Sequence, residues 1–230
     1  MTLHGESLYW NPIRLQKATD AFICPCRFMA DKMKGSGLFS SKIMVLPNFI
    51  DTRKCVVSDF NKGDYYCYVG RLSEEKGVKT LVEAANKIPC RKLIVVGEGS
   101  MQDELRKQVM NHVIFTGKMT WKEVKQTVSK ARFTVIPSEW YENCPLSVIE
   151  SLCLGTPVLG ARIGGIPELI DEPSAGLTFE SGNVDDLEHK IKQMFEADFD
   201  YERIAATSRC RFDAGTYYNQ IMNIYTHATE

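Results

Sequence analysis

From residue 65 onward, short apolar runs alternate with segments in which apolar residues recur every three or four positions. The runs predict buried parallel strands over Tyr65–Val69, Leu93–Val96, Val113–Phe115, Phe133–Ile136 and Val158–Gly160. The intervening segments predict helices over Val78–Ala85, Met101–Val109, Trp121–Val128 and Val184–Phe195. Strict alternation implies right-handed crossovers, so the predicted fold class is α/β, a doubly wound parallel sheet of the Rossmann type. Such sheets bind ligands beyond the carboxyl ends of their strands.

The composition is that of a globular protein. With 44% hydrophobic and 25% charged residues among 230, a core can form, and the length suits one large domain or one domain with part of another. A net charge of -1 gives no electrostatic case for nucleic acid as a partner. There is no signal peptide, no long apolar run and no C-x-x-C pair. We therefore expect reduced cysteines and a cytoplasmic location, with peripheral attachment at the inner membrane face left open.

The first 50 residues follow a different pattern. They predict a helix near 14–18, a strand at 21–24, a helix near 28–33 and a strand at 43–46. A strand at 21–24 without a sheet of its own would expose unpaired edges. A separate partner chain, self-association or truncation of a longer protein would each account for this.

Two glutamates distinguish the segment 137–158, which is predicted to run from a strand end through a loop and a short helix to the next strand. Glu142 lies in the loop and Glu150 in the helix. Glu150 adjoins the apolar face of Leu146, Ile149 and Cys153, where a carboxylate is unusual unless it has a partner. An ionised carboxylate only accepts hydrogen bonds, so the hydroxyl pair of a sugar or a ribose would be such a partner.

Two cations, Arg71 and Lys76, lie in a predicted strand-to-helix connection. Arginine offers a planar fork of donors and lysine a point charge, and the two together suit the oxygens of a phosphate. The spacing alone somewhat favours the alternative, two surface cations near a turn.

The start of the helix after Asn143 is a second candidate anion site. Pro145 suits the first helical turn. The amides of Cys144, Leu146 and Ser147 would then be free at the positive end of the helix dipole, where phosphate binds. Simple capping of the helix is the alternative, and it would need no glutamate nearby.

Paired glycines follow two of the predicted strands. Gly97 and Gly99 would permit a tight turn, and turn formation explains them as well as ligand binding does. Gly164 and Gly165 stand before Pro167 and would let the backbone approach a ligand closely. These glycines add to the case for a site at the strand ends without identifying its ligand.

Taken together, these segments resemble glycosyltransferase family 4, whose members are retaining enzymes with two Rossmann-like domains, the GT-B fold. The matching motifs occur in the family's order: Val69-Gly70-Arg71-Leu72, Glu75-Lys76-Gly77, Val96-Gly97-Glu98-Gly99, Phe115-Thr116-Gly117, the glutamates Glu142 and Glu150, Gly155-Thr156-Pro157-Val158 and Gly164-Gly165-Ile166-Pro167-Glu168. The resemblance implies the C-terminal, donor-binding half of such an enzyme.

The resemblance also implies roles for single residues. Glu142 is expected beside the donor sugar as the catalytic residue, either stabilising the positive charge that develops on the sugar or only holding its hydroxyls. Glu150 is expected at the ribose hydroxyls, and Arg71 and Lys76 at the diphosphate. The other expected donor-binding residues are Gly97, Gly99, Lys118, Asn143, Cys144, Leu146 and Ser147. Backbone atoms around Lys118 would contact the base, which therefore cannot be identified. Cations and helix amides would meet the phosphate charge, so we expect no metal and no other cofactor.

By the same resemblance, residues 1–50 would be a remnant of the acceptor-side domain and 51–212 the nucleotide-sugar-binding domain. Residues 213–230 would form a helix that crosses back toward the cleft. The expected partners are a nucleotide-diphosphate sugar and a glycan or lipid-linked acceptor, with a separate acceptor-domain chain or self-association left open.

The predicted function is retaining transfer of a sugar from a nucleotide-diphosphate sugar, with this chain alone incomplete or inactive. A non-catalytic nucleotide-sugar-binding or partner module is the main alternative. A nucleotide-sugar epimerase of similar architecture is disfavoured by the ordered Arg71–Lys76 and Glu142–Glu150 signatures. For the reaction, departure and attack on the same face of the sugar ranks above a double displacement with a carboxylate nucleophile.

Overall fold

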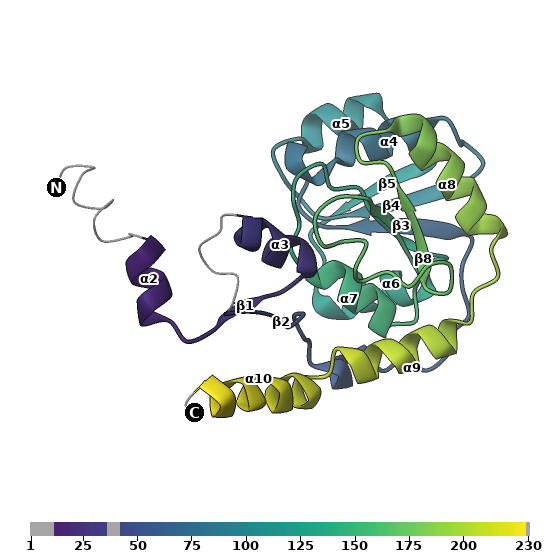
Figure 1. Ribbon diagram of the computed structural model, residues 1–230. Coiled ribbons are helices and arrows are strands. Elements are labelled where there is room, and N and C mark those ends of the chain that lie inside the picture. Colours follow the sequence, from purple (N-terminus) through teal and green to yellow (C-terminus); the bar gives the residue numbers. More distant parts are fainter. Residues whose placement is uncertain (1–11, 36–41, 229–230) are drawn as a thin grey trace.

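The protein is an α/β structure, seen here in a computed structural model that describes residues 12–35 and 42–228 (Figure 1). Of the predicted remnant 1–50, residues 1–11 and 36–41 lie outside the described part. Within that part, no helix combines the length and the apolar character that crossing a bilayer requires.

The core of the molecule is a six-stranded sheet with the order β5-β4-β3-β6-β7-β8. Its strands are β3 (Tyr65–Val69), β4 (Lys92–Val96), β5 (Val113–Gly117), β6 (Thr134–Ile136), β7 (Val158–Ala161) and β8 (Gly176–Phe179). Every neighbouring pair is parallel, which confirms the predicted doubly wound sheet. The chain moves outward from β3 to β5 and then returns to place β6 on the other side of β3. Strand order therefore reverses between β3 and β6, the position at which open α/β sheets bind ligands.

Helices cover both faces of this sheet (Figure 1). One face carries α4 (Val78–Asn86), α5 (Gln102–Gln108) and α8 (Val184–Glu196), and the other carries α6 (Trp121–Lys130) and α7 (Leu146–Cys153), with α9 (Tyr201–Arg211) packed on α7. Local side chains start several of these helices. Thr120 and Glu123 form a capping box at α6, and Asn183 and Asp200 accept hydrogen bonds from the first turns of α8 and α9.

The sequence did not predict β8 and α9. In β8 the short run Gly176-Leu-Thr-Phe contains a glycine and a threonine, so it lacks the continuous apolar character by which the other strands were recognised. In α9 the buried residues are Ile204, Ala205 and Ser208, and this weakly apolar face gives little periodic signal. The other predicted elements of the large domain are present, with ends that differ by at most two residues.

The N-terminal region forms α2 (Pro12–Ala18), β1 (Phe22–Cys24), α3 (Arg27–Gly35) and β2 (Ile43–Val45). In the described residues β1 pairs with β2 alone, in parallel, so the predicted strand at 21–24 belongs to a small sheet of its own. Figure 1 shows helix α10 (Ala214–Ala228) leaving the large domain on the side of this small sheet.

The chain passes into the large domain near residue 50 and out of it near residue 213, and these two segments lie side by side. Ile50 forms a β-bridge with Asp213, and Thr52, in the 3-10 helix η1 (Thr52–Cys55), donates a hydrogen bond of 2.7 Å to the Asp213 carboxylate. The rings of Phe49 and Tyr217 have centroids 4.3 Å apart. The chain thus enters and leaves the large domain at one place.

Candidate functional site

The loops that follow β3, β4, β5, β6 and β7 form one continuous rim at the carboxyl ends of the strands. Backbone contacts join the first three loops: the Gly97 amide donates to the Gly117 carbonyl, and the Leu72 amide to the Glu98 carbonyl. The Glu139 amide donates to the Glu75 carbonyl and links the β6 loop to the β3 loop. The predicted donor-binding loops therefore do meet at one edge of the sheet.

An ion pair lies at the switch point of this rim. The Lys76 ammonium, from the 3-10 helix η2 (Glu74–Lys76) after β3, donates to the Glu142 carboxylate in the loop after β6. Ser138 donates to the same carboxylate at 3.1 Å. The side chains of Lys76 and Glu142 are 29% and 20% exposed, so water screens their interaction less than in a surface pair. Two of the predicted site residues are thus in direct contact.

Arg71 is placed differently from Lys76. Its guanidinium donates to the Glu75 carboxylate at 2.9 Å, and its side chain is 66% exposed. The structure therefore brings Arg71 to the rim of the candidate site but pairs it with a neighbour in its own loop. A diphosphate would have to replace Glu75 as its partner or share it.

The glycines after β4 have a packing role. A Cβ atom on Gly97 would lie 1.9 Å from the Gly70 carbonyl oxygen, and one on Gly99 would lie 2.2 Å from the Leu72 carbonyl oxygen. Gly97 also has a φ of +132°, which side chains rarely allow. Both glycines are therefore required where the β4 loop lies against the β3 loop, whether or not they touch a ligand.

Gly164 and Gly165 hold the loop after β7 against the loop after β6. The Gly165 amide donates to the Glu142 carbonyl at 2.6 Å. A Cβ atom on Gly165 would lie 1.9 Å from the Asn143 carbonyl oxygen and 2.7 Å from the Cβ of Cys26. The close approach predicted for this pair is therefore an approach to protein backbone, and it positions the loop that carries Glu142.

The start of α7 differs in one detail from the prediction. Pro145 is the N-cap and not a residue of the first turn, so the helix begins at Leu146. The Pro145 carbonyl accepts from the Val148 amide, and no side chain caps the helix. Asn48 donates to the Cys144 carbonyl at 3.0 Å and thereby ties the segment before β3 to this loop. The amides of Leu146 and Ser147 remain at the helix start, as an anion site requires.

Glu150 is half-buried on α7, and burial raises the pKa of its carboxyl above the usual value of 4.5. Within the described residues, its side chain has no recorded hydrogen bond. Partial burial makes the charged form of this carboxyl less favourable than in water, and a hydrogen-bond donor would offset that cost. A hydroxyl group of a ligand could donate such a hydrogen bond to the Glu150 carboxylate.

Replacing Glu150 by glutamine is expected to stabilise the protein at neutral pH and to weaken its binding of a nucleoside diphosphate. The raised pKa means that the folded state holds its proton more tightly than the unfolded state. The stability that this proton gives is present below pH 4.5 and is lost as the pH rises through the folded-state pKa. Glutamine is neutral throughout, so the Tm of the variant should exceed that of the parent at pH 7 and match it near pH 4.

The loss of a hydrogen bond between this carboxylate and a ribose hydroxyl should cost about 2 kcal/mol of affinity. Calorimetric titrations and melting curves at both pH values check the two effects in the same variants. A glutamine variant that binds as tightly as the parent would contradict the role at the ribose. Equal Tm values of the variant and the parent at pH 7 would contradict the idea that the charged Glu150 carboxylate destabilises the folded state.

Lys118 and Asn143 are exposed at this rim. The Lys118 amide points to the Glu98 carboxylate at 3.4 Å, so the loop after β5 touches the loop after β4 through its backbone. The described residues contain no cluster of three or more histidine, cysteine, aspartate or glutamate side chains that could hold a metal ion.

Sequence reasoning missed two residues that organise the site. It gave no role to Ser138, which donates to Glu142, although a small hydroxyl residue directly after a strand is a recognisable signal. It included Glu168 in a motif without a function. The Glu168 carboxylate accepts from the amides of Arg27 and Phe28 at 2.7 Å each, and so holds the start of α3 against the large domain.

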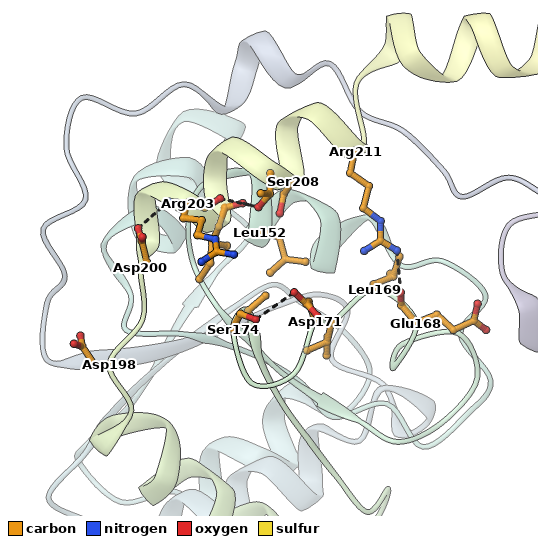
Figure 2. A pocket seen from close by; sticks show the side chains of 14 residues that line it. Leu152, Glu168, Leu169, Asp171, Ser174, Asp198, Asp200, Arg203, Ser208 and Arg211 are labelled. Atoms are coloured by element: carbon orange, nitrogen blue, oxygen red, sulfur yellow. Dashed lines mark hydrogen bonds between the residues drawn. The ribbon is translucent and has the colours of Figure 1, made fainter.

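A cavity of about 500 Å³ lies between α9 and the segment 168–175, which belongs to the loop after β7 (Figure 2). Figure 2 shows Arg203 and Asp171 at its wall, and Arg211 donating to the Glu168 carbonyl. Among the described residues that line it, none is a predicted donor-binding residue. The predicted donor-binding residues therefore lie around the loops at the strand ends and do not line this cavity.

The sequence is similar to those of known proteins. Residues 54–211 match the family described as glycosyl transferases group 1. The sulfoquinovosyl transferase of Arabidopsis thaliana is 33% identical over 131 residues, which are 55% of this chain and 26% of that protein. The glycogen synthase of Mycobacterium tuberculosis is 29% identical over 174 residues, 70% of this chain and 42% of that protein. The chain thus spans less than half the length of either relative.

Solved structures agree in fold. The complex of Anabaena HepE with UDP superposes with a TM-score of 0.81 at 22% identity, over 91% of this chain and 64% of that chain. A glycosyltransferase from Rickettsia africae superposes with a TM-score of 0.82 at 16% identity, over all of this chain and 68% of that one. At these identities the likeness concerns the fold. With the Rickettsia africae structure it extends over the whole chain, and so includes the small N-terminal sheet and α10.

Proposed function

The chain belongs to the glycosyl transferases group 1 family, and from this premise we propose that it is the donor-binding part of a retaining glycosyltransferase. The donor is a nucleotide-diphosphate sugar, and the acceptor is a glycan or a lipid-linked saccharide. The observation that supports the proposal is the Lys76–Glu142 ion pair at the switch point of the sheet; in this proposal Lys76 is the cation for phosphate and Glu142 the carboxylate for the sugar.

In this proposal the diphosphate lies between the loop after β3 and the start of α7. An ammonium group has three donors, so Lys76 can bind a phosphate oxygen and keep Glu142 as a partner. Arg71 and the free amides of Leu146 and Ser147 supply further donors. These groups meet the charge of the leaving diphosphate, and the reaction requires no metal.

Glu142 then lies next to the anomeric carbon of the donor sugar. Its negative charge stabilises the positive charge that develops on the sugar as the diphosphate departs. The acceptor attacks the face from which the diphosphate leaves, and this keeps the configuration of the sugar. Glu150 accepts hydrogen bonds from the ribose hydroxyls. The names of the relatives, which include a glycogen synthase and a lipopolysaccharide core glycosyltransferase, favour a place in glycan synthesis.

The direct test is calorimetric titration of the chain with UDP, GDP and ADP in the presence of a metal chelator. We expect at least one of them to bind, because the donors for the diphosphate all come from the protein. If none binds, the donor-site assignment is wrong. If binding appears only after Mg²⁺ replaces the chelator, the donor site stands and metal independence is wrong.

A further inference from the structure

Three aromatic rings stand in a row at the outer edge of the candidate site. The centroids of Trp140 and Tyr141 are 6.2 Å apart, and those of Tyr141 and Phe28 are 4.8 Å apart. Trp140 is 70% exposed and Tyr141 is 55% exposed. We call these three residues the aromatic row. Burial of such rings stabilises a fold, so the exposed neighbouring rings of Trp140 and Tyr141, which lie beside the half-buried Phe28, mark a candidate binding surface.

A cation is fixed at one end of the aromatic row. The ammonium of Lys32 lies 5.5 Å from the centroid of Phe28 and 5.4 Å from that of Tyr141, within the range of cation–π attraction. The Lys32 side chain therefore lies over the rings of Phe28 and Tyr141, whereas Trp140 is largely exposed to solvent. The row thus offers a flat apolar surface at one end and a positive charge at the other.

Hydrogen bonds to carboxylates fix each of the two segments that build the aromatic row. Phe28 and Lys32 belong to α3, whose first amides bind the Glu168 carboxylate. Tyr141 directly precedes Glu142, whose carboxylate is held by Lys76 and Ser138. The row is therefore attached to the residue proposed to act at the sugar, and its position relative to that residue is set by these bonds.

We propose that the aromatic row and Lys32 form an acceptor subsite for a saccharide that bears an anionic group. A sugar ring presents a flat face of C–H groups, which fits the open indole of Trp140, and the anionic group lies near the Lys32 ammonium. The proposal rests on the proposed transferase function and specifies the acceptor chemistry. A saccharide is the occupant that suits both an apolar ring face and the continuity of the row with Glu142.

The test compares two probes of equal length, a neutral oligosaccharide of glucose and an oligosaccharide of a uronic acid. Binding to the full chain is measured by calorimetry and by tryptophan fluorescence. Trp140→Ala should weaken binding of both probes by about tenfold or more, the scale found for a central aromatic contact. Lys32→Gln should weaken binding of the uronic acid probe several-fold and leave the neutral probe unchanged.

The matched controls are Trp121→Ala on α6 and Lys34→Gln on α3, which remove the same side-chain types outside the aromatic row. They should bind both probes as the unmodified chain does. The nucleoside diphosphate titration is repeated on every variant and should not change, which separates this inference from the donor site.

Three results would overturn the proposal in a sample that still binds a nucleoside diphosphate. One is the absence of oligosaccharide binding at millimolar concentrations. Another is unchanged affinity in Trp140→Ala, or equal effects of Lys32→Gln on both probes. The third is a change in the oligomeric state of Trp140→Ala by light scattering without a change in oligosaccharide affinity, which would assign the row to a protein contact. Failure of the diphosphate titration alone would instead contradict the proposed function.

Discussion

Replacing Lys76 by methionine is expected to weaken nucleoside diphosphate binding by about 3 kcal/mol, or roughly 150-fold. The substitution removes a cation from the proposed phosphate site, and it also leaves the half-buried Glu142 carboxylate without its ionic partner. The unpaired negative charge would then face an anionic ligand. The two effects act in the same direction, so the loss should exceed that of a single charged hydrogen bond.

A double-mutant cycle separates the two effects. Glu142→Gln alone should leave the affinity for a nucleoside diphosphate unchanged or somewhat tighter, because Lys76 is freed for phosphate. The combined variant should bind more tightly than Lys76→Met alone, since the repulsive carboxylate is gone. Lys79→Met, which removes an exposed lysine on the neighbouring helix α4, is the matched control and should have little effect. If Lys76→Met and Lys79→Met behave alike, Lys76 has no role at the diphosphate.

Replacing Gly97 by alanine is expected to destabilise the fold by about 4 kcal/mol, the sum of backbone strain and overpacking. The φ of +132° is one that alanine rarely adopts, and the added Cβ would lie 1.9 Å from the Gly70 carbonyl oxygen. The obstructing atoms belong to the Gly70 backbone, which cannot rotate away as a flexible side chain could. The loop after β4 would therefore have to leave the loop after β3, and the rim of the site would open.

Chemical denaturation followed by circular dichroism measures this loss. Gly35→Ala is the control, because a Cβ atom there would meet nothing within 4 Å and the residue closes helix α3. It should change the free energy of unfolding by less than about 1 kcal/mol. A Gly97→Ala variant as stable as Gly35→Ala would show that the loop accommodates a side chain, and the close approach of the two loops would be wrong.

Several features of the site were open to prediction because they depend on local sequence. Lys76 and Glu142 could each be placed at a strand end, since a buried run followed by a helical pattern defines where a strand stops. The pairing of Lys76 with Glu142 could not be predicted, because it joins residues 66 positions apart through the packing of β3 beside β6. The attachment of α3 by Glu168, across 140 positions or more, was missed for the same reason.

The sequence by itself determined the class of fold and the edge of the sheet at which the site lies. Apolar periodicity reports which segments are buried and in what conformation, and alternation of strand and helix leaves few ways to connect them. Only the tertiary structure decided which charges are neighbours: Lys76 meets Glu142, Arg71 meets Glu75, and Glu150 is left with no hydrogen-bonding partner among the described residues. The physical reason is that a charged side chain finds its partner through the distances between loops, and those distances follow from strand order and layer packing, which no local pattern encodes.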